Sequence, residues 1–152
     1  MKKLISSLLL LLALTCGLAG ATTADAATWH HGSFPKTVRG YWHQTIKKNK
    51  TTVQYRYTKK YQDAQLLGKV KGKWEHAMLN RVNTYNGPVR YKVTGHHKYY
   101  FAATKKQVKN RFFTGADRMI LTKKGHRLIM KLHYKGAHKW TKPTTLHAGK
   151  VK

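Results

Sequence analysis

The chain has 152 residues, and its 31 lysines and arginines against four aspartates and glutamates give a formal net charge of +27 at pH 7. So few acids argue against an enzyme that works with a pair of carboxylates, as most glycoside hydrolases do. The four tryptophans, nine tyrosines and four phenylalanines argue against disorder, because side chains of this size bury a core despite the charge.

Residues 1–26 have the pattern of a secretory signal peptide. A positively charged start is followed by an almost unbroken apolar run over 4–14 and an Ala-Asp-Ala cleavage site that ends at Ala26. The run is too short to cross a bilayer comfortably, so we expect no transmembrane segment. We expect a single secreted domain over 27–152, which contains no cysteine and must fold without disulfides.

Alternating apolar and polar residues in the rest of the chain predict antiparallel strands. In Val53–Thr58, for example, valine and two tyrosines fall on one face of a strand. Apolar spacing over 74–85 also fits a short helix, and two glycines in 61–73 indicate a flexible basic loop. The predicted strands are roughly 39–47, 51–60, 76–84, 89–95, 97–103, 109–114, 117–123, 126–134 and 138–142.

Short strands at this regular spacing predict an all-β fold, namely a single antiparallel barrel of about eight strands, with a two-sheet sandwich as the alternative. Pro35 fixes the entry of the chain into the first strand. Gly40 allows that strand to bend or to approach another backbone closely, and Trp42 is then placed to close the bottom of the barrel.

The tripeptide Gly40-Tyr41-Trp42 resembles the Gly-x-Trp motif on the first strand of lipocalin-like barrels. The stretch PKTVRGYW is also similar to the opening of small secreted proteins of lactic-acid bacteria, which end in strands similar to 117–134. The resemblance implies a lipocalin-like barrel and an extracellular location, but no known activity. In lipocalins an arginine of the last strand covers the tryptophan, and Arg127 or Arg118 would have that structural role here.

The domain holds few groups for catalysis or metal binding. Its only acids are Asp63, Glu75 and Asp117, and none of them lies in a catalytic motif. Two pairs of adjacent histidines would point to opposite faces of a strand, which does not suit a shared zinc ion. We therefore expect a protein that is not an enzyme and has no metal or cofactor.

Cations dominate the predicted outer faces and loops, whereas we expect the aromatic side chains to point into the core. Because lysine outnumbers arginine, the pattern favours diffuse attraction to phosphate over shaped recognition of one group. The candidate polyanion-binding residues are Lys47, Lys48, Lys50, Arg56, Lys69, Lys71, Lys73, Arg90, Lys92, Lys105, Lys106, Lys123, Lys124 and Lys131.

These observations predict a non-enzymatic secreted protein that associates with anionic cell-surface polymers such as teichoic acid and is retained at the cell wall. One alternative is a lipocalin-like protein that binds a small apolar ligand inside the barrel. Another is a cationic antimicrobial protein, or a nuclease that uses histidine and lysine for acid–base catalysis.

Overall fold

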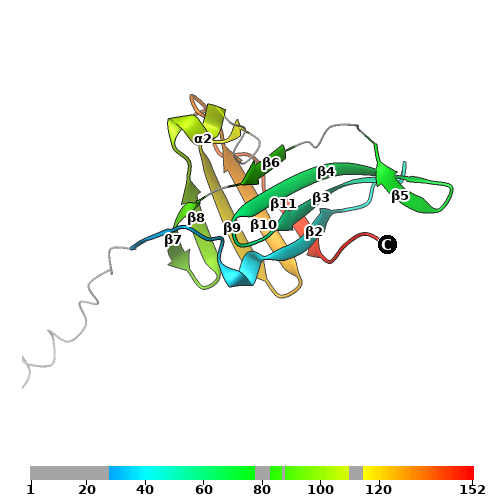
Figure 1. Ribbon diagram of the computed structural model, residues 1–152, viewed down its shortest axis with the longest axis horizontal. Coiled ribbons are helices and arrows are strands. Elements are labelled where there is room, and N and C mark those ends of the chain that lie inside the picture. The colour runs from blue at the N-terminus through cyan, green and yellow to red at the C-terminus, as the bar shows by residue number, and fades with distance from the viewer. Residues whose placement is uncertain (1–27, 78–82, 87, 110–114) are drawn as a thin grey trace, which may run out of the picture.

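The computed structural model describes residues 28–77, 83–86, 88–109 and 115–152, so the expected signal peptide lies outside the described residues. Nearly all the regular structure is β-strand, and every strand pair is antiparallel, which confirms the all-β prediction (Figure 1). The elements in chain order are β1 (Trp29–His31), the 3-10 helix η1 (Lys36–Val38), β2 (Gly40–Gln44), β3 (Thr51–Tyr57), β4 (Tyr61–Val70), β5 (Lys73–His76), β6 (Asn83–Asn86), β7 (Arg90–Gly95), β8 (Lys98–Ala102), α2 (Lys105–Lys109), β9 (Arg118–Lys124), β10 (Arg127–His133) and β11 (Thr144–Ala148).

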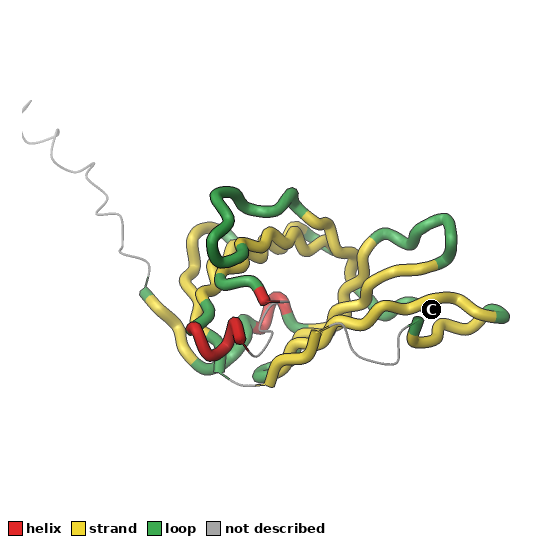
Figure 2. The backbone as a smooth tube through the Cα atoms, turned by 90° about the horizontal axis from the view of Figure 1, so that it is seen from above, coloured by secondary structure: helices red, strands yellow, loops and turns green. Residues whose placement is uncertain are grey.

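The strands form one sheet in the order β1-β7-β8-β9-β10-β11-β2-β3-β4-β5, and β6 also pairs with β4. The sheet curls strongly, and β11 pairs with β2, so that the end of the chain lies beside its first long strand (Figure 2). It is not a closed barrel, since the hydrogen-bonded path through the described strands ends at β1 on one side and at β5 on the other.

One face of the sheet carries the core. On β3, Tyr55 lies opposite Trp42 of β2 and Ala64 of β4, and all three side chains are buried. Tyr57 follows on the same face, and the alternation seen in the sequence therefore places tyrosines inside. Other completely buried side chains are Phe34, Val38, Val89, Phe101, Met119, Leu121, Leu128 and Leu146.

Trp42 lies in this core, and its indole nitrogen donates a 2.8 Å hydrogen bond to the carbonyl oxygen of Val38 in η1. Gly40 has a φ of +125°, a left-handed conformation that a side chain would strain, and it sits where the chain leaves η1 for β2. The prediction that Arg127 covers Trp42 is wrong, because Arg127 is exposed and lies on the face of β10 opposite to buried Leu128. Arg118 lies on that same outer face, opposite His133.

Some predicted elements differ from the structure. The sequence predicts a loop over 61–73, whereas the structure has the ten-residue strand β4 there. Both faces of β4 are largely covered, so its residues do not alternate between apolar and polar. Strands β1 and β11 were missed, and 138–142 contains no strand. Residues 73–76 are a strand rather than part of a helix, whereas 78–82 lie outside the described residues. Of the predicted strand 109–114, Lys109 is the last residue of helix α2, and 110–114 lie outside the described residues.

Candidate functional site

The last four residues of the sequence cross the outer face of the sheet and are held there by three hydrogen bonds. The Gly149 amide donates to the carbonyl oxygen of Tyr41 at 2.8 Å. The Val151 amide donates to Oε1 of Gln54 at 3.0 Å, and the Val151 side chain is only 8% exposed. The indole nitrogen of Trp74 donates to the main-chain oxygen of Lys152 at 2.6 Å. This C-terminal segment thereby forms a wall above strands β2, β3 and β4.

A cavity of about 530 Å³ lies beside the C-terminal segment, and we call it the Arg56 cavity. Its side chains come from β2 to β5 and from the segment itself. The cations that line it are Arg56, Lys73, Lys150 and Lys152. The polar and aromatic residues that line it include Tyr41, Gln54, Tyr61, Asp63, Gln65, Trp74 and His76.

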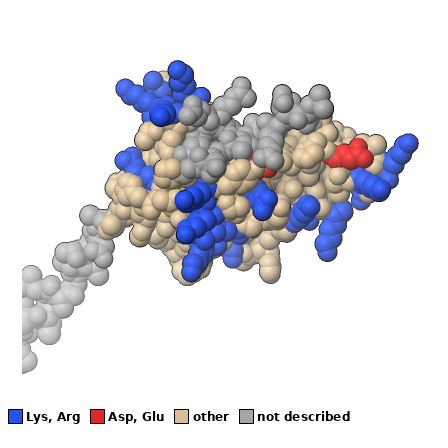
Figure 3. Space-filling view, in the orientation of Figure 1, with Lys and Arg blue, Asp and Glu red and all other residues tan. Residues whose placement is uncertain are grey.

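A second cavity, of about 470 Å³, shares Gly72, Trp74 and Lys152 with the first. We call it the Lys71 cavity, and the two together the paired cavities. The residues found only in the second are Ile46, Lys50, Lys69 and Lys71. Lys152 and the Trp74 side chain therefore belong to both hollows, and cations line each of them. Figure 3 shows Lys and Arg side chains projecting from the end of the molecule where β5 lies.

Two turns bring the lysines of the Lys71 cavity together. Lys71 and Gly72 have φ values of 46° and 82°, as a two-residue type I′ hairpin requires, and they connect β4 to β5. Lys50 ends the turn before β3 with a φ of 54°. The Lys69 amide donates to the carbonyl oxygen of Lys50 at 2.9 Å, which joins the two turns at one end of the sheet.

Cations outnumber acids among the described side chains that line the paired cavities, where Asp63 is the one acidic side chain. Asp63 is 6% exposed, and its Oδ2 accepts a 2.7 Å hydrogen bond from the side-chain amide of Gln65. Arg56 lies 5.3 Å and Lys150 5.9 Å from the centre of the Tyr41 ring. Such cation–π contacts restrain the cations while leaving their charge unneutralised, and an anion that enters is attracted from several sides.

The paired cavities bring together five of the predicted polyanion-binding residues, namely Lys50, Arg56, Lys69, Lys71 and Lys73. Lys47 and Lys48 lie in the adjoining turn. The others are spread over β7 (Arg90, Lys92), α2 (Lys105, Lys106), β9 (Lys123, Lys124) and β10 (Lys131). Sequence reasoning missed Lys150, Lys152 and Trp74, because a segment without regular structure carries no pattern that reveals its packing against a distant hairpin.

A second feature of the outer surface is a row of half-buried aromatic side chains over β1, β8 and the segment after β10. The ring centres of Trp29 and Tyr100 are 6.2 Å apart, and those of Tyr100 and Trp140 are 6.3 Å apart. Arg90 and Lys92 lie 4.2 Å and 4.9 Å from the centre of the Trp29 ring. The expectation that the aromatics point into the core is wrong for this aromatic row. In β8, the adjacent Tyr99 and Tyr100 necessarily occupy opposite faces.

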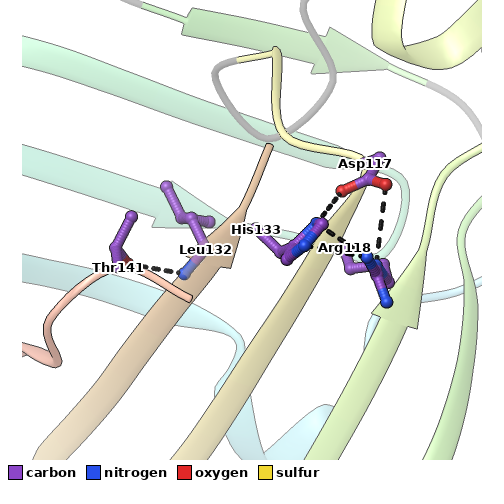
Figure 4. Close-up of polar contacts among 5 residues, drawn as sticks. All are labelled: Asp117, Arg118, Leu132, His133 and Thr141. Carbon is purple, nitrogen blue, oxygen red and sulfur yellow. Dashed lines mark hydrogen bonds and ion pairs between the residues drawn. The ribbon is translucent and has the colours of Figure 1, made fainter. Parts of the chain in front are cut away.

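Asp117, Arg118 and His133 form an ion-pair cluster (Figure 4). It adjoins the aromatic row, since the ring centres of His133 and Trp140 are 5.4 Å apart. His133 is 6% exposed, and its Nδ1 lies 2.7 Å from Oδ1 of Asp117. One terminal nitrogen of the Arg118 guanidinium lies 2.9 Å from each ring nitrogen of His133, and Arg118 Nε is 3.6 Å from Asp117 Oδ2. The three groups bond to one another and join the ends of β9 and β10, so we assign them a structural role.

Within the described residues, no set of three or more histidine, cysteine, aspartate or glutamate side chains is grouped as a metal site requires. No helix in the described ranges has the length and apolar character needed to span a membrane. Comparison of the chain with protein-family models, with curated proteins and with solved structures gave no match.

Proposed function

We propose that the protein is a non-enzymatic binder of polyanions, and that the paired cavities are its principal contact with them. The observation that supports this proposal is the gathering of seven cations around two adjoining cavities that contain one acidic side chain, Asp63. The cations are Lys50, Arg56, Lys69, Lys71, Lys73, Lys150 and Lys152.

The energetic reason is electrostatic. Like charges that a fold holds close together repel one another, and a bound polyanion relieves this repulsion. The polymer also releases its condensed counterions when lysines and arginines neutralise its phosphates, which adds a favourable entropy. Binding of this kind does not require a motif for one base or one sugar, which suits a surface rich in lysine.

The proposal includes a location, which rests on the signal-peptide pattern of residues 1–26. A cationic protein exported into a wall that contains teichoic acid or a similar phosphate polymer would be retained there by charge. A small ligand carried in the interior that the curled sheet encloses is a weaker proposal. Large buried side chains, such as those of Tyr57, Phe34, Phe101 and Met119, fill that interior.

The direct test is chromatography on immobilised heparin or a phosphate polymer. We expect retention at low salt and release by sodium chloride. For duplex DNA, the logarithm of the binding constant falls by about 0.9 for each tenfold rise in salt and each phosphate contact. Replacing Lys69, Lys71 and Lys73 with glutamate should lower the salt needed for elution more than the same replacement of Lys105, Lys106 and Lys109 on α2. Elution of the unmodified protein in the void volume at low salt would contradict polyanion binding.

The location is tested by separating a culture of the producing cells into medium, salt wash and cell wall. We expect the protein in the wall fraction at low ionic strength and in the wash when salt is added, because screening weakens contacts between exposed charges. Recovery of all the protein from the medium at low ionic strength would contradict retention at the surface.

A further inference from the structure

We propose that the paired cavities bind two successive repeats of one phosphodiester-linked polyol chain, with a phosphate in each cavity. This inference rests on the proposed function and names the class of polymer that the site takes. The first argument is the division of the cations. Arg56, Lys73 and Lys150 line only the Arg56 cavity, whereas Lys50, Lys69 and Lys71 line only the other. Lys152 belongs to both.

Two separate groups of cations with a shared wall fit a ligand whose negative charges are also separate. A single carboxylate or phosphate would use one group and leave the other unneutralised. A polymer with a charge on every repeat engages both, and linking the two contacts makes the second one intramolecular. The shared Lys152 and Trp74 mark the place that the linker between two phosphates would cross.

The polar lining of the Arg56 cavity favours a hydroxylated linker. Gln54 and Gln65 of neighbouring strands contribute side-chain amides, and Asp63 contributes a buried carboxylate hydrogen-bonded to Gln65. A carboxylate repels an anion but accepts hydrogen bonds from hydroxyl groups. The side of the cavity that contains Asp63 therefore suits the uncharged polyol, while the cations suit the phosphates.

Two of the rings at the site, those of Tyr41 and Trp74, lie close to the protein's own cations. Arg56 and Lys150 lie over Tyr41, and Lys69 lies 5.8 Å from the centre of the Trp74 ring. Proteins that hold single-stranded nucleic acid use open aromatic faces on which bases stack. The rings of Tyr41 and Trp74 are not open in that way, so a polymer without bases fits better than a nucleic acid.

The experiment is a calorimetric titration of the purified protein with a synthetic glycerol phosphate oligomer of several repeats. The variants are Arg56→Gln and Lys71→Gln, one for each cavity. Their matched controls are Arg127→Gln and Lys98→Gln, whose side chains are exposed on other strands. We expect each cavity variant to weaken binding about tenfold, as the loss of one charge-assisted hydrogen bond would. Each control should weaken it less than about twofold, since screened surface charges contribute little.

Three outcomes would overturn the inference while leaving polyanion binding intact. Controls that weaken binding as much as the cavity variants would show diffuse attraction. A loss on Arg56→Gln with none on Lys71→Gln would show that only one cavity is used. An oligothymidylate with the same number of phosphates that binds as tightly, and loses as much on both cavity variants, would show that the polyol is not recognised. If Arg56→Gln lowers the unfolding temperature, Lys150→Gln takes its place as the variant of that cavity.

Discussion

The two halves of the sheet present cations on their outer faces in different settings. Over β2 to β5, the C-terminal segment crosses the strands and leaves two cavities, around which lysines and arginines converge. Over β1 and β7 to β10, Arg90 and Lys92 lie close to the Trp29 ring, and Arg118 is joined to Asp117 and His133. A chain segment that lies across the sheet, rather than the number of cations on the sheet, therefore creates a site where several charges face one ligand.

The largest loss of stability should come from a change in the core, which supports the outer surfaces of both halves of the sheet. Trp42→Ala deletes a buried aromatic side chain and its hydrogen bond to Val38. We expect the free energy of unfolding to fall by about 3–5 kcal/mol, the usual loss for a large buried aromatic. Urea denaturation followed by circular dichroism measures this. A loss near zero would mean that Trp42 does not stabilise the core shared by the two halves of the sheet.

The next change separates the two faces. Val151→Asp places a carboxylate where a buried valine anchors the C-terminal segment to the sheet. We expect the segment to detach, with a loss of about 1.5–3 kcal/mol of the free energy of unfolding, the value of a buried valine side chain. Trp74 should become more exposed as its bond to Lys152 breaks, and a red shift of tryptophan fluorescence would report it.

The control for this variant is Val93→Asp on β7, where the valine is 43% exposed. We expect its stability to change by less than about 0.5 kcal/mol, as for most surface substitutions. If both variants lose the same stability, the C-terminal segment is not held by Val151, and the paired cavities lose their wall.

The sequence alone predicted the class of fold and the burial of Trp42, because strict alternation and a glycine before an aromatic residue are local signals. It did not reveal β4, whose Gln62, Asp63 and Ala64 are all buried, so that neither face appears solvent-exposed in the pattern. Nor did it reveal the paired cavities. Their lysines were recognised as cations, but their convergence depends on contacts between Trp74 and Lys152, which no local pattern encodes.

The stability of the fold should fall at alkaline pH, because buried tyrosines in the core must then remain neutral or lose their protons. Burial raises the pKa of Tyr57 above its usual value, and burial also raises that of Tyr55 despite a side-chain hydrogen bond from Gln44 that lowers it. The neutral phenols therefore stabilise the fold fully below the unfolded pKa of about 10, and this stabilisation is lost as the pH rises above it. We expect a loss of up to about 1.4 kcal/mol for each pH unit per fully buried group.

Tyr57→Phe should reduce this alkaline loss, because phenylalanine has no proton to release. At neutral pH the variant loses only a long contact of 3.9 Å between the phenol oxygen and the sulfur of Met130. Burial also raises the pKa of Tyr91 beneath the aromatic row, but this side chain is only half-buried, and Tyr91→Phe should change the alkaline loss less. Unfolding temperatures measured from about pH 8 to pH 11, which is about one unit above the usual tyrosine pKa, would compare the two variants. A larger effect of Tyr91→Phe would reverse the expected order.

The smallest expected effect concerns the salt dependence of polyanion binding. Lys71→Gln removes a cation from the paired cavities, and Arg90→Gln removes one that lies over Trp29 in the aromatic row. If the polymer contacts the cavities, Lys71→Gln should lower the slope of log K against log salt by about 0.7, the value for one phosphate contact on a flexible single strand. Arg90→Gln should lower this slope by less than half as much, because Arg90 interacts mainly with the Trp29 ring. Such an exposed cation–π contact is worth about 0.5–1 kcal/mol. Binding of a phosphate polymer measured at four salt concentrations, a series spanning about 50 to 200 mM, gives both slopes. Equal slopes for the two variants would show that the polymer touches both faces alike, and the cavities would then have no advantage over an exposed arginine.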